Sequence, residues 1–407
     1  IAYLRNNERM LRALAHPVYR RLFGAQVVAL AGTGLATVAL GLLAYDLAGA
    51  GAGAVLGTAF AIKMLAYVVV APVAAVVVAR APRRAVMVGS DVLRLVVALA
   101  LPFVGEVWQV FALIFVLQAA SATFTPTFQS VIPQVLPDER DYTAALSLSR
   151  LAYDLEAVLA PVLAAALLLV VPAGALFVGT AVGFAGSALL VSSVALPRGP
   201  APSTAPFRAR VRRGADLVVR TPALRPVLAL NLVVAAAGAF VLVQTVVIVR
   251  GVLGLGDGVV ALVLAANGLG SMAAALTLPR VLRRLPERPV MLGGAVVLCL
   301  ATAAVPLALH HLAAVCILWV LVGLGWAAVE TPVGRLVRRE VPADDLPAAF
   351  AAQFSLSHAC WLLTYPLAGW LGAVGLPLAA AVLAALATAG TITAAVLWPA
   401  RLVSLRS

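Results

Sequence analysis

The sequence predicts an all-α membrane protein with twelve transmembrane helices in two six-helix pseudo-repeats. Of its 407 residues, 63% are hydrophobic and only 11% are charged, whereas a soluble domain carries about 25% charged residues. Apolar runs of roughly 20 residues, the length that crosses the hydrocarbon of a bilayer, recur along the whole chain. Strands of a membrane barrel would be about ten residues long with alternating polarity, so helices are the spanning elements that fit.

The spans follow from the apolar runs in chain order. Each run is rich in Ala, Val, Leu and Gly and is about long enough for one crossing. We expect the spans at residues 22–44, 54–78, 86–105, 107–128, 148–171, 174–196, 226–249, 258–279, 289–309, 312–334, 349–371 and 375–398.

The basic residues predict the orientation of these spans. Of the 29 Lys and Arg residues, 26 lie in the two tails and in the even-numbered loops, and the odd-numbered loops hold only Arg250. Lys63 and Arg94 lie within spans. Because basic loops stay in the cytoplasm, we expect a multi-pass protein of the cell inner membrane with both termini cytoplasmic. The net charge of +13 is thereby explained without a nucleic-acid partner.

Internal repetition predicts two related halves. Four short patterns recur in the same order at offsets of 200 to 208 residues, which favours duplication. The pairs are 17–20 with 222–225, 80–84 with 280–284, 125–126 with 331–332, and 146–150 with 354–358. We therefore expect an N-terminal six-helix half at 1–196, a basic cytoplasmic linker at 197–225 and a C-terminal six-helix half at 226–407.

The loop after the second span carries a family motif in part. Arg80, Arg83 and Arg84 match the basic residues of the motif that is most specific to the major facilitator superfamily, which the chain resembles over essentially its whole length. Ala75 and Ala79 stand where that motif has Gly and Asp. The resemblance implies the major facilitator fold, with the three arginines at a cytoplasmic gate. The missing Asp puts the usual form of that gate in doubt.

Two stretches resemble a narrower branch. Residues 124–133 (FTPTFQSVIP) and 135–140 (VLPDER) look like efflux proteins that include macrolide and siderophore exporters. Residues 353–361 (QFSLSHACW) are similar to nickel-resistance exporters of that branch. The resemblance implies a secondary active exporter that works by alternating access, with its cavity lined by the first, fourth, seventh and tenth spans.

Charged residues within spans are costly and are usually functional or paired. Asp91 and Arg94 are three residues apart, share a helix face, and are expected to pair near the gate. Glu156 has no helical partner of opposite charge and lies near the midplane, as does Lys63. A Lys63–Glu156 pair serves either as a structural staple or as a proton-coupling site, and both alternatives stay open at this point. Two further carboxylates are candidates for proton coupling, namely Asp154 and Glu330.

Polar side chains without charge are candidates for the substrate cavity. They are Gln26, Gln118, Asn231 and Asn267. Each of them also fits a hydrogen bond between helices. His358 and Cys360 suit nickel or cobalt, but residues two apart do not share a helix face, so metal is the alternative only.

These observations predict a proton-coupled exporter of a small molecule or drug. The alternatives are a transition-metal exporter and a non-transporting receptor or scaffold on the same fold. We expect a monomer without a cofactor. No phosphate-binding loop is found, so ATP is not expected to drive transport. No nucleophile–base constellation stands out, so an enzyme is not expected.

Overall fold

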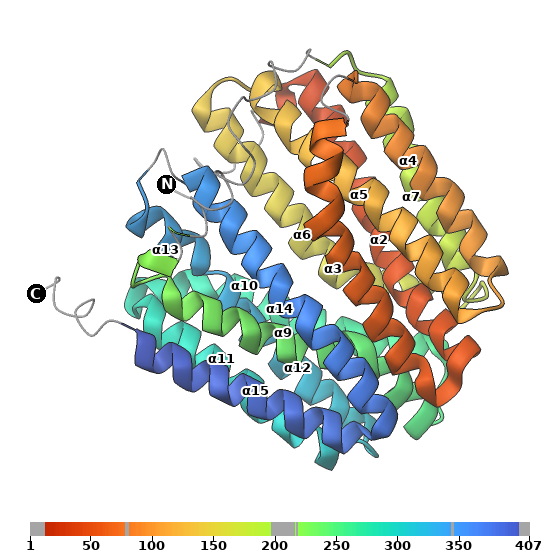
Figure 1. Ribbon diagram of the computed structural model, residues 1–407, viewed down its shortest axis with the longest axis vertical. Helices are drawn as coiled ribbons and strands as arrows, with labels where there is room; N and C mark the ends of the chain where they lie inside the picture. Colours follow the sequence, from red (N-terminus) through yellow and green to blue (C-terminus); the bar gives the residue numbers. More distant parts are fainter. Residues whose placement is uncertain (1–12, 78–80, 197–215, 217–218, 343–345, 399–407) are drawn as a thin grey trace, which may run out of the picture. The chain divides into compact units, whose positions relative to one another are not determined.

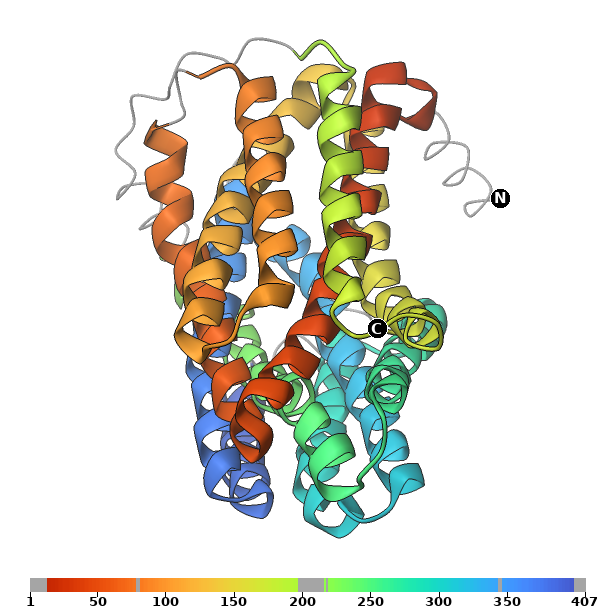
Figure 2. The same ribbon diagram turned by 90° about the vertical axis from the view of Figure 1, so that its right-hand side faces the viewer.

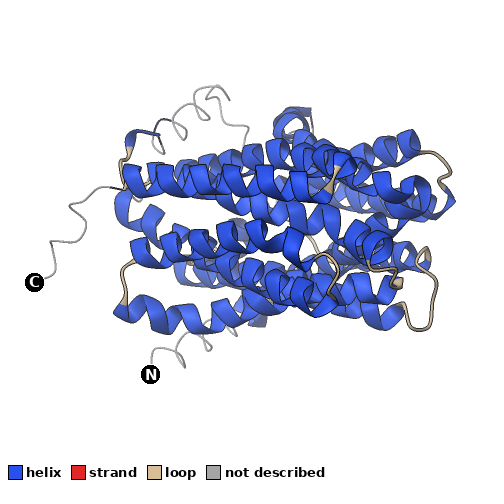
Figure 3. Cartoon of the chain, turned by 90° about the horizontal axis from the view of Figure 1, so that it is seen from below, coloured by secondary structure: helices blue, strands red, loops and turns tan. Residues whose placement is uncertain are grey.

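The computed structural model describes residues 13–77, 81–196, 216, 219–342 and 346–398. Within these ranges the chain is helical and contains no strand (Figure 3). Twelve described helices have 18 or more residues, one for each expected span. They are α2 (Pro17–Ala48), α3 (Ala52–Val77), α4 (Arg83–Ala100), α5 (Val107–Val135), α6 (Glu139–Leu167), α7 (Ala175–Ser192), α9 (Arg225–Val246), α10 (Asp257–Arg284), α11 (Glu287–Ala308), α12 (Leu312–Glu330), α14 (Leu346–Val374) and α15 (Leu376–Leu397). A short helix, α13 (Val333–Glu340), follows α12.

Length and hydropathy mark nine segments of the described residues as able to cross a membrane. The first of them, Pro17–Val70, contains α2 and most of α3, while α6 and α14 are not among the nine. The all-α membrane fold is therefore confirmed, and the count of twelve crossings stays a prediction.

Local sequence explains where several helices begin. Pro82, Pro286 and Pro332 stand immediately before α4, α11 and α13. A proline there ends the preceding segment without breaking a hydrogen bond of the new helix. At α5, a capping box joins Glu106 and Gln109, which satisfies backbone N–H groups that the first turn leaves free.

The chain divides into two compact units. The first covers Ile1–Leu43 and Leu65–Ser203, and in it α4 packs against α5 and α7 (Figure 1 and Figure 2). Its buried residues include Tyr19, whose hydroxyl donates to the carbonyl oxygen of Ala145 at 3.1 Å. This bond ties the start of α2 to α6.

The second unit covers Ala44–Met64 and Thr204–Ser407. In it α12 packs against α10 and α11, and α9 packs against α14 and α15. A Cβ at Gly270 would lie 1.9 Å from the carbonyl oxygen of Val320, and one at Gly323 would lie 1.9 Å from that of Asn267. Small residues thus let α10 and α12 approach backbone to backbone, as is common in membrane bundles. The expected half boundaries at 196 and 226 stay a prediction.

Candidate functional site

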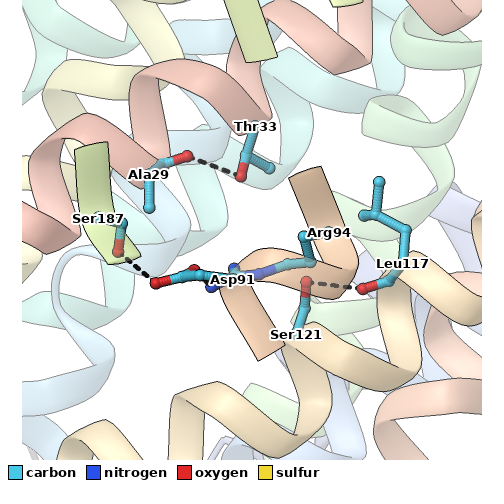
Figure 4. Close-up of polar contacts among 7 residues, drawn as sticks. All are labelled: Ala29, Thr33, Asp91, Arg94, Leu117, Ser121 and Ser187. Atoms are coloured by element: carbon cyan, nitrogen blue, oxygen red, sulfur yellow. Dashed lines mark hydrogen bonds and ion pairs between the residues drawn. The ribbon is translucent and has the colours of Figure 1, made fainter. Parts of the chain in front are cut away.

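A buried charge cluster lies among α4, α5 and α7 of the first unit. Asp91 on α4 forms an ion pair with Arg94 one turn further on, and the two side chains are 0% and 6% exposed. The second carboxylate oxygen of Asp91 accepts a hydrogen bond from Ser187 Oγ on α7 at 2.7 Å (Figure 4). The Arg94 guanidinium carbon lies 4.5 Å from the ring centroids of both Phe124 and Phe184. The cluster therefore joins α4 to α5 and α7.

The expected pairing of Asp91 with Arg94 is present, while their role in a gate stays a prediction. Among the expected gate arginines, Arg83 donates to the carbonyl oxygen of Ser130 on α5 at 3.3 Å. Arg84 is exposed at the start of α4, and Arg80 lies outside the described residues.

A line of polar side chains runs between α2 and α6. Gln26 on α2 accepts a hydrogen bond from Ser149 Oγ at 2.9 Å and also interacts with Tyr153. Further along, the carboxylate of Glu156 lies directly against Gly34: a Cβ at that glycine would stand 2.7 Å from Glu156 Oε1. That Cβ would also stand 2.1 Å from Ala160 Cβ, so the glycine lets α2 and α6 pack closely beside the carboxyl group.

The structure does not test whether two other expected residues, Lys63 and Asp154, act together with these polar side chains. Lys63 belongs to the second unit and Glu156 to the first, so the Lys63–Glu156 pair stays a prediction. The side chain of Asp154 lies outside the described residues. Gln118 is buried on α5, and its cavity role also stays a prediction.

Two expected cavity amides of the second unit make hydrogen bonds between helices. Asn231 on α9 accepts from Gln353 Nε2 on α14 at 3.1 Å. Asn267 on α10 donates to the carbonyl oxygen of Trp319 on α12 at 3.2 Å. Each bond is a hydrogen bond between helices, which was the expected alternative to a position in the substrate cavity. A role of either amide in binding substrate stays a prediction.

A third amide, Gln244, is buried where α3, α9 and α14 meet. Its Nε2 donates to the carbonyl oxygen of Ala368 at 2.6 Å. A Cβ at Gly53 or at Gly372 would lie 2.6 Å or 2.0 Å from that nitrogen, so the two glycines make room for the amide. The hydrogen bond and the glycines together lock the start of α3 to α9 and α14.

An ionic cluster at the end of α9 was not expected from the sequence. Arg250 contacts Asp46 at 2.6 Å and Asp257 at 3.4 Å, and its guanidinium carbon lies 4.5 Å from the ring centroid of Tyr45. We call these four residues the Arg250 cluster. The signal was available, because Arg250 is the single basic residue of the odd-numbered loops.

An aromatic cluster from α3, α12 and α14 was also missed. The ring centroids of Trp326 and Trp361 are 5.1 Å apart, those of Trp361 and Tyr365 are 5.0 Å apart, and those of Phe60 and Tyr365 are 5.1 Å apart. A Cβ at Gly238 on α9 would lie 2.4 Å from the Trp361 ring and 2.9 Å from the Trp326 ring. We call the four aromatic residues the aromatic cluster.

The sequence profile of the Major Facilitator Superfamily matches residues 22–258. The chain belongs to the major facilitator superfamily. No curated protein sequence matches this superfamily member significantly.

Several solved transporter structures share this fold. The nucleoside transporter NupG, in a mutant form, is 13% identical with a TM-score of 0.70, over 93% of this chain and 100% of that one. A POT family transporter in complex with 5-aminolevulinic acid is 12% identical with a TM-score of 0.70, over 93% and 96%. A bacterial homolog of the human lysosomal transporter Spinster is 14% identical with a TM-score of 0.69, over 96% and 95%. At these identities the likeness shows the fold alone.

The two residues of the metal alternative, His358 and Cys360, both lie on α14 of this superfamily member. In the part of the chain that the structure describes, no three His, Cys, Asp or Glu side chains gather as metal ligands. His358 Nδ1 lies 2.7 Å from the carbonyl oxygen of Phe354, whereas Cys360 lines a groove with Arg225 and Thr393. Glu330, the last residue of α12, lies within electrostatic range of Cys360. The two proposed ligands thus have different surroundings, as their spacing predicts.

Proposed function

We propose that this chain is a secondary active exporter that moves a small organic molecule by alternating access and uses protons as the driving ion. Membership of the superfamily and the transporter fold support transport. The resemblance of residues 124–140 to efflux proteins supports the outward direction. The distribution of basic residues supports a cell inner membrane with cytoplasmic termini.

The position of Glu156 is the observation that carries proton coupling. Its carboxylate is partly buried within an apolar bundle and lies against Gly34 of α2. Burial favours the protonated form of a carboxyl group, and a change of exposure to water favours release of the proton. A carboxyl group between two packed helices therefore exchanges its proton when those helices move.

Contacts in the second unit support alternating access. Residues 44–64 come from the N-terminal half of the sequence, yet they pack with helices of the C-terminal half. The Arg250 cluster and the glycine contacts of α3 hold them there. In the proposed alternating-access cycle, these contacts between the two sequence halves form in one state and break in the other.

Replacing Glu156 by Gln tests the proposal in proteoliposomes. The first readout is the proton flux that each compound of an organic panel causes under an imposed pH gradient. The second readout is exchange of the same compound across the membrane without a gradient. We expect Glu156→Gln to fold and to exchange substrate, but to lose accumulation driven by the gradient. Glu340→Gln is the matched control, since Glu340 bonds only its neighbour Arg339 among described residues.

Two results would overturn parts of the proposal. If Glu156→Gln accumulates substrate normally from a pH gradient, Glu156 does not carry the proton, and Asp154 and Glu330 become the candidates. If the parent protein exchanges compounds but no gradient of protons drives net movement, proton coupling itself is wrong.

A further inference from the structure

The two tryptophans of the aromatic cluster differ from others in the second unit. Trp319 is fully buried, and both Trp319 and the exposed Trp370 donate their indole N–H to a threonine hydroxyl. Trp326 and Trp361 are partly exposed, and within the described residues neither indole N–H donates a hydrogen bond. Two large rings are therefore packed together while their polar edges stay available to a ligand.

The side of α12 that carries Trp326 is opposite to its apolar outer side. Ile317, Leu321 and Leu324 are exposed, as residues that face lipid are. Trp326 follows Leu324 by two residues, which is a rotation of about 200° around the helix. Glu330 follows Trp326 by four residues and shares its side. A carboxylate and an indole thus face the same direction, away from the exposed leucines.

The packing of α9 creates the space that these rings use. Gly238 lies under both indoles, and a methyl group there would collide with each of them. The two indole rings thus lie against the backbone of α9, and behind Trp361 the buried rings of Tyr365 and Phe60 continue the apolar packing. The accessible part of the cluster is therefore the pair of tryptophan rings, which lie over a glycine.

Two charged side chains lie near the pair of tryptophans. Glu330 lies one turn beyond Trp326 and within electrostatic range of Cys360, which neighbours Trp361. Lys63 follows Phe60 by three residues on α3 and lies within electrostatic range of His358. His358 precedes Trp361 by one helical turn, so both charges lie near the tryptophans, and the carboxylate is the one that shares a helix side with Trp326.

We propose that the aromatic cluster and Glu330 bind an aromatic organic cation, which is the substrate class of the exporter. The π-faces of tryptophan attract cations more strongly than those of the other aromatic side chains. Rings of the ligand stack on Trp326 and Trp361 while its cationic centre faces Glu330. This inference rests on the proposed function for the fate of the ligand, but binding itself is measured without transport.

The test uses two probes of nearly equal shape and opposite charge. Tetraphenylphosphonium and tetraphenylborate each carry four phenyl rings, so they separate charge recognition from apolar binding. Binding is measured by titration calorimetry on the purified full chain in detergent, with empty micelles as the blank. We expect saturable binding of tetraphenylphosphonium and at least tenfold weaker binding of tetraphenylborate.

Variants locate the site. We expect Trp326→Ala and Trp361→Ala each to weaken tetraphenylphosphonium binding about three- to thirtyfold, and Glu330→Gln to weaken it about tenfold. Trp326→Phe, which keeps a ring, should lose less than Trp326→Ala and guards against a folding defect. Trp108→Ala is the matched control, because Trp108 is exposed at the start of α5 in the first unit.

The outcomes separate this inference from the proposed function. Equal binding of the two probes, or unchanged binding by folded Trp326→Ala and Trp361→Ala, would overturn the inference even if pH-driven export of another compound is observed. Binding that follows the expected order without gradient-driven transport would support the inference and overturn the proposed function.

Discussion

Replacing Asp91 by Asn should destabilise the first unit strongly. The change keeps the size of the side chain but leaves Arg94 buried beside a neutral amide. Both side chains are almost entirely buried, so water cannot replace the lost counter-charge. Breaking a buried ion pair from one side typically costs about 3–5 kcal/mol, and we expect a loss of unfolding free energy in this range.

The neighbouring Ser187 gives an independent measure of the same cluster. Ser187→Ala removes one hydrogen bond to a charged oxygen, which is worth about 1.5–3 kcal/mol. In the double variant Asp91→Asn/Ser187→Ala, the charged acceptor is already gone. The loss should therefore be smaller than the sum of the two single losses, by about 1 kcal/mol or more.

The assay is reversible unfolding of the purified protein in mixed detergent micelles, followed by circular dichroism. Ser192→Ala is the control on the same helix, because its hydroxyl bonds only a carbonyl of its own helix, Leu189, in the described structure. The reasoning is refuted if Ser187→Ala and Ser192→Ala lose equal stability, or if the losses of Asp91→Asn and Ser187→Ala simply add.

Two further predictions concern packing and topology. Gly57→Ala should lower the unfolding free energy by about 1–3 kcal/mol, since its Cβ would stand 2.4 Å from the carbonyl oxygen of Tyr365. Gly41→Ala, whose Cβ would meet nothing within 4 Å, should leave stability nearly unchanged, and equal effects would contradict this packing argument. A cysteine at Gly256 should react with an impermeant maleimide in intact cells, whereas one at Thr221 should react only after permeabilisation. Labelling of both from the same side would rule out the expected span order.

Much of the fold follows from the sequence because it depends on local properties. The length of each apolar run and the alternation of basic loops predict helices that agree one for one with the long helices of the structure. Helix ends are less determined: α5 continues to Val135 beyond its expected end at 128, because a helix need not stop where the apolar run does. The contact between Asp91 and Arg94 was predictable, since residues three apart share a face of any helix.

Contacts between helices were decided only by the tertiary structure. Sequence separation does not indicate that Glu156 lies against Gly34, that Ser187 completes the Asp91 cluster, or that Arg250 meets Asp46. Nor does it bring Trp326 and Trp361 together over a glycine of a third helix. The physical reason is that a helix fixes the spacing of its own residues, whereas the rotation and depth of each helix are set by how small and large side chains interlock across the bundle.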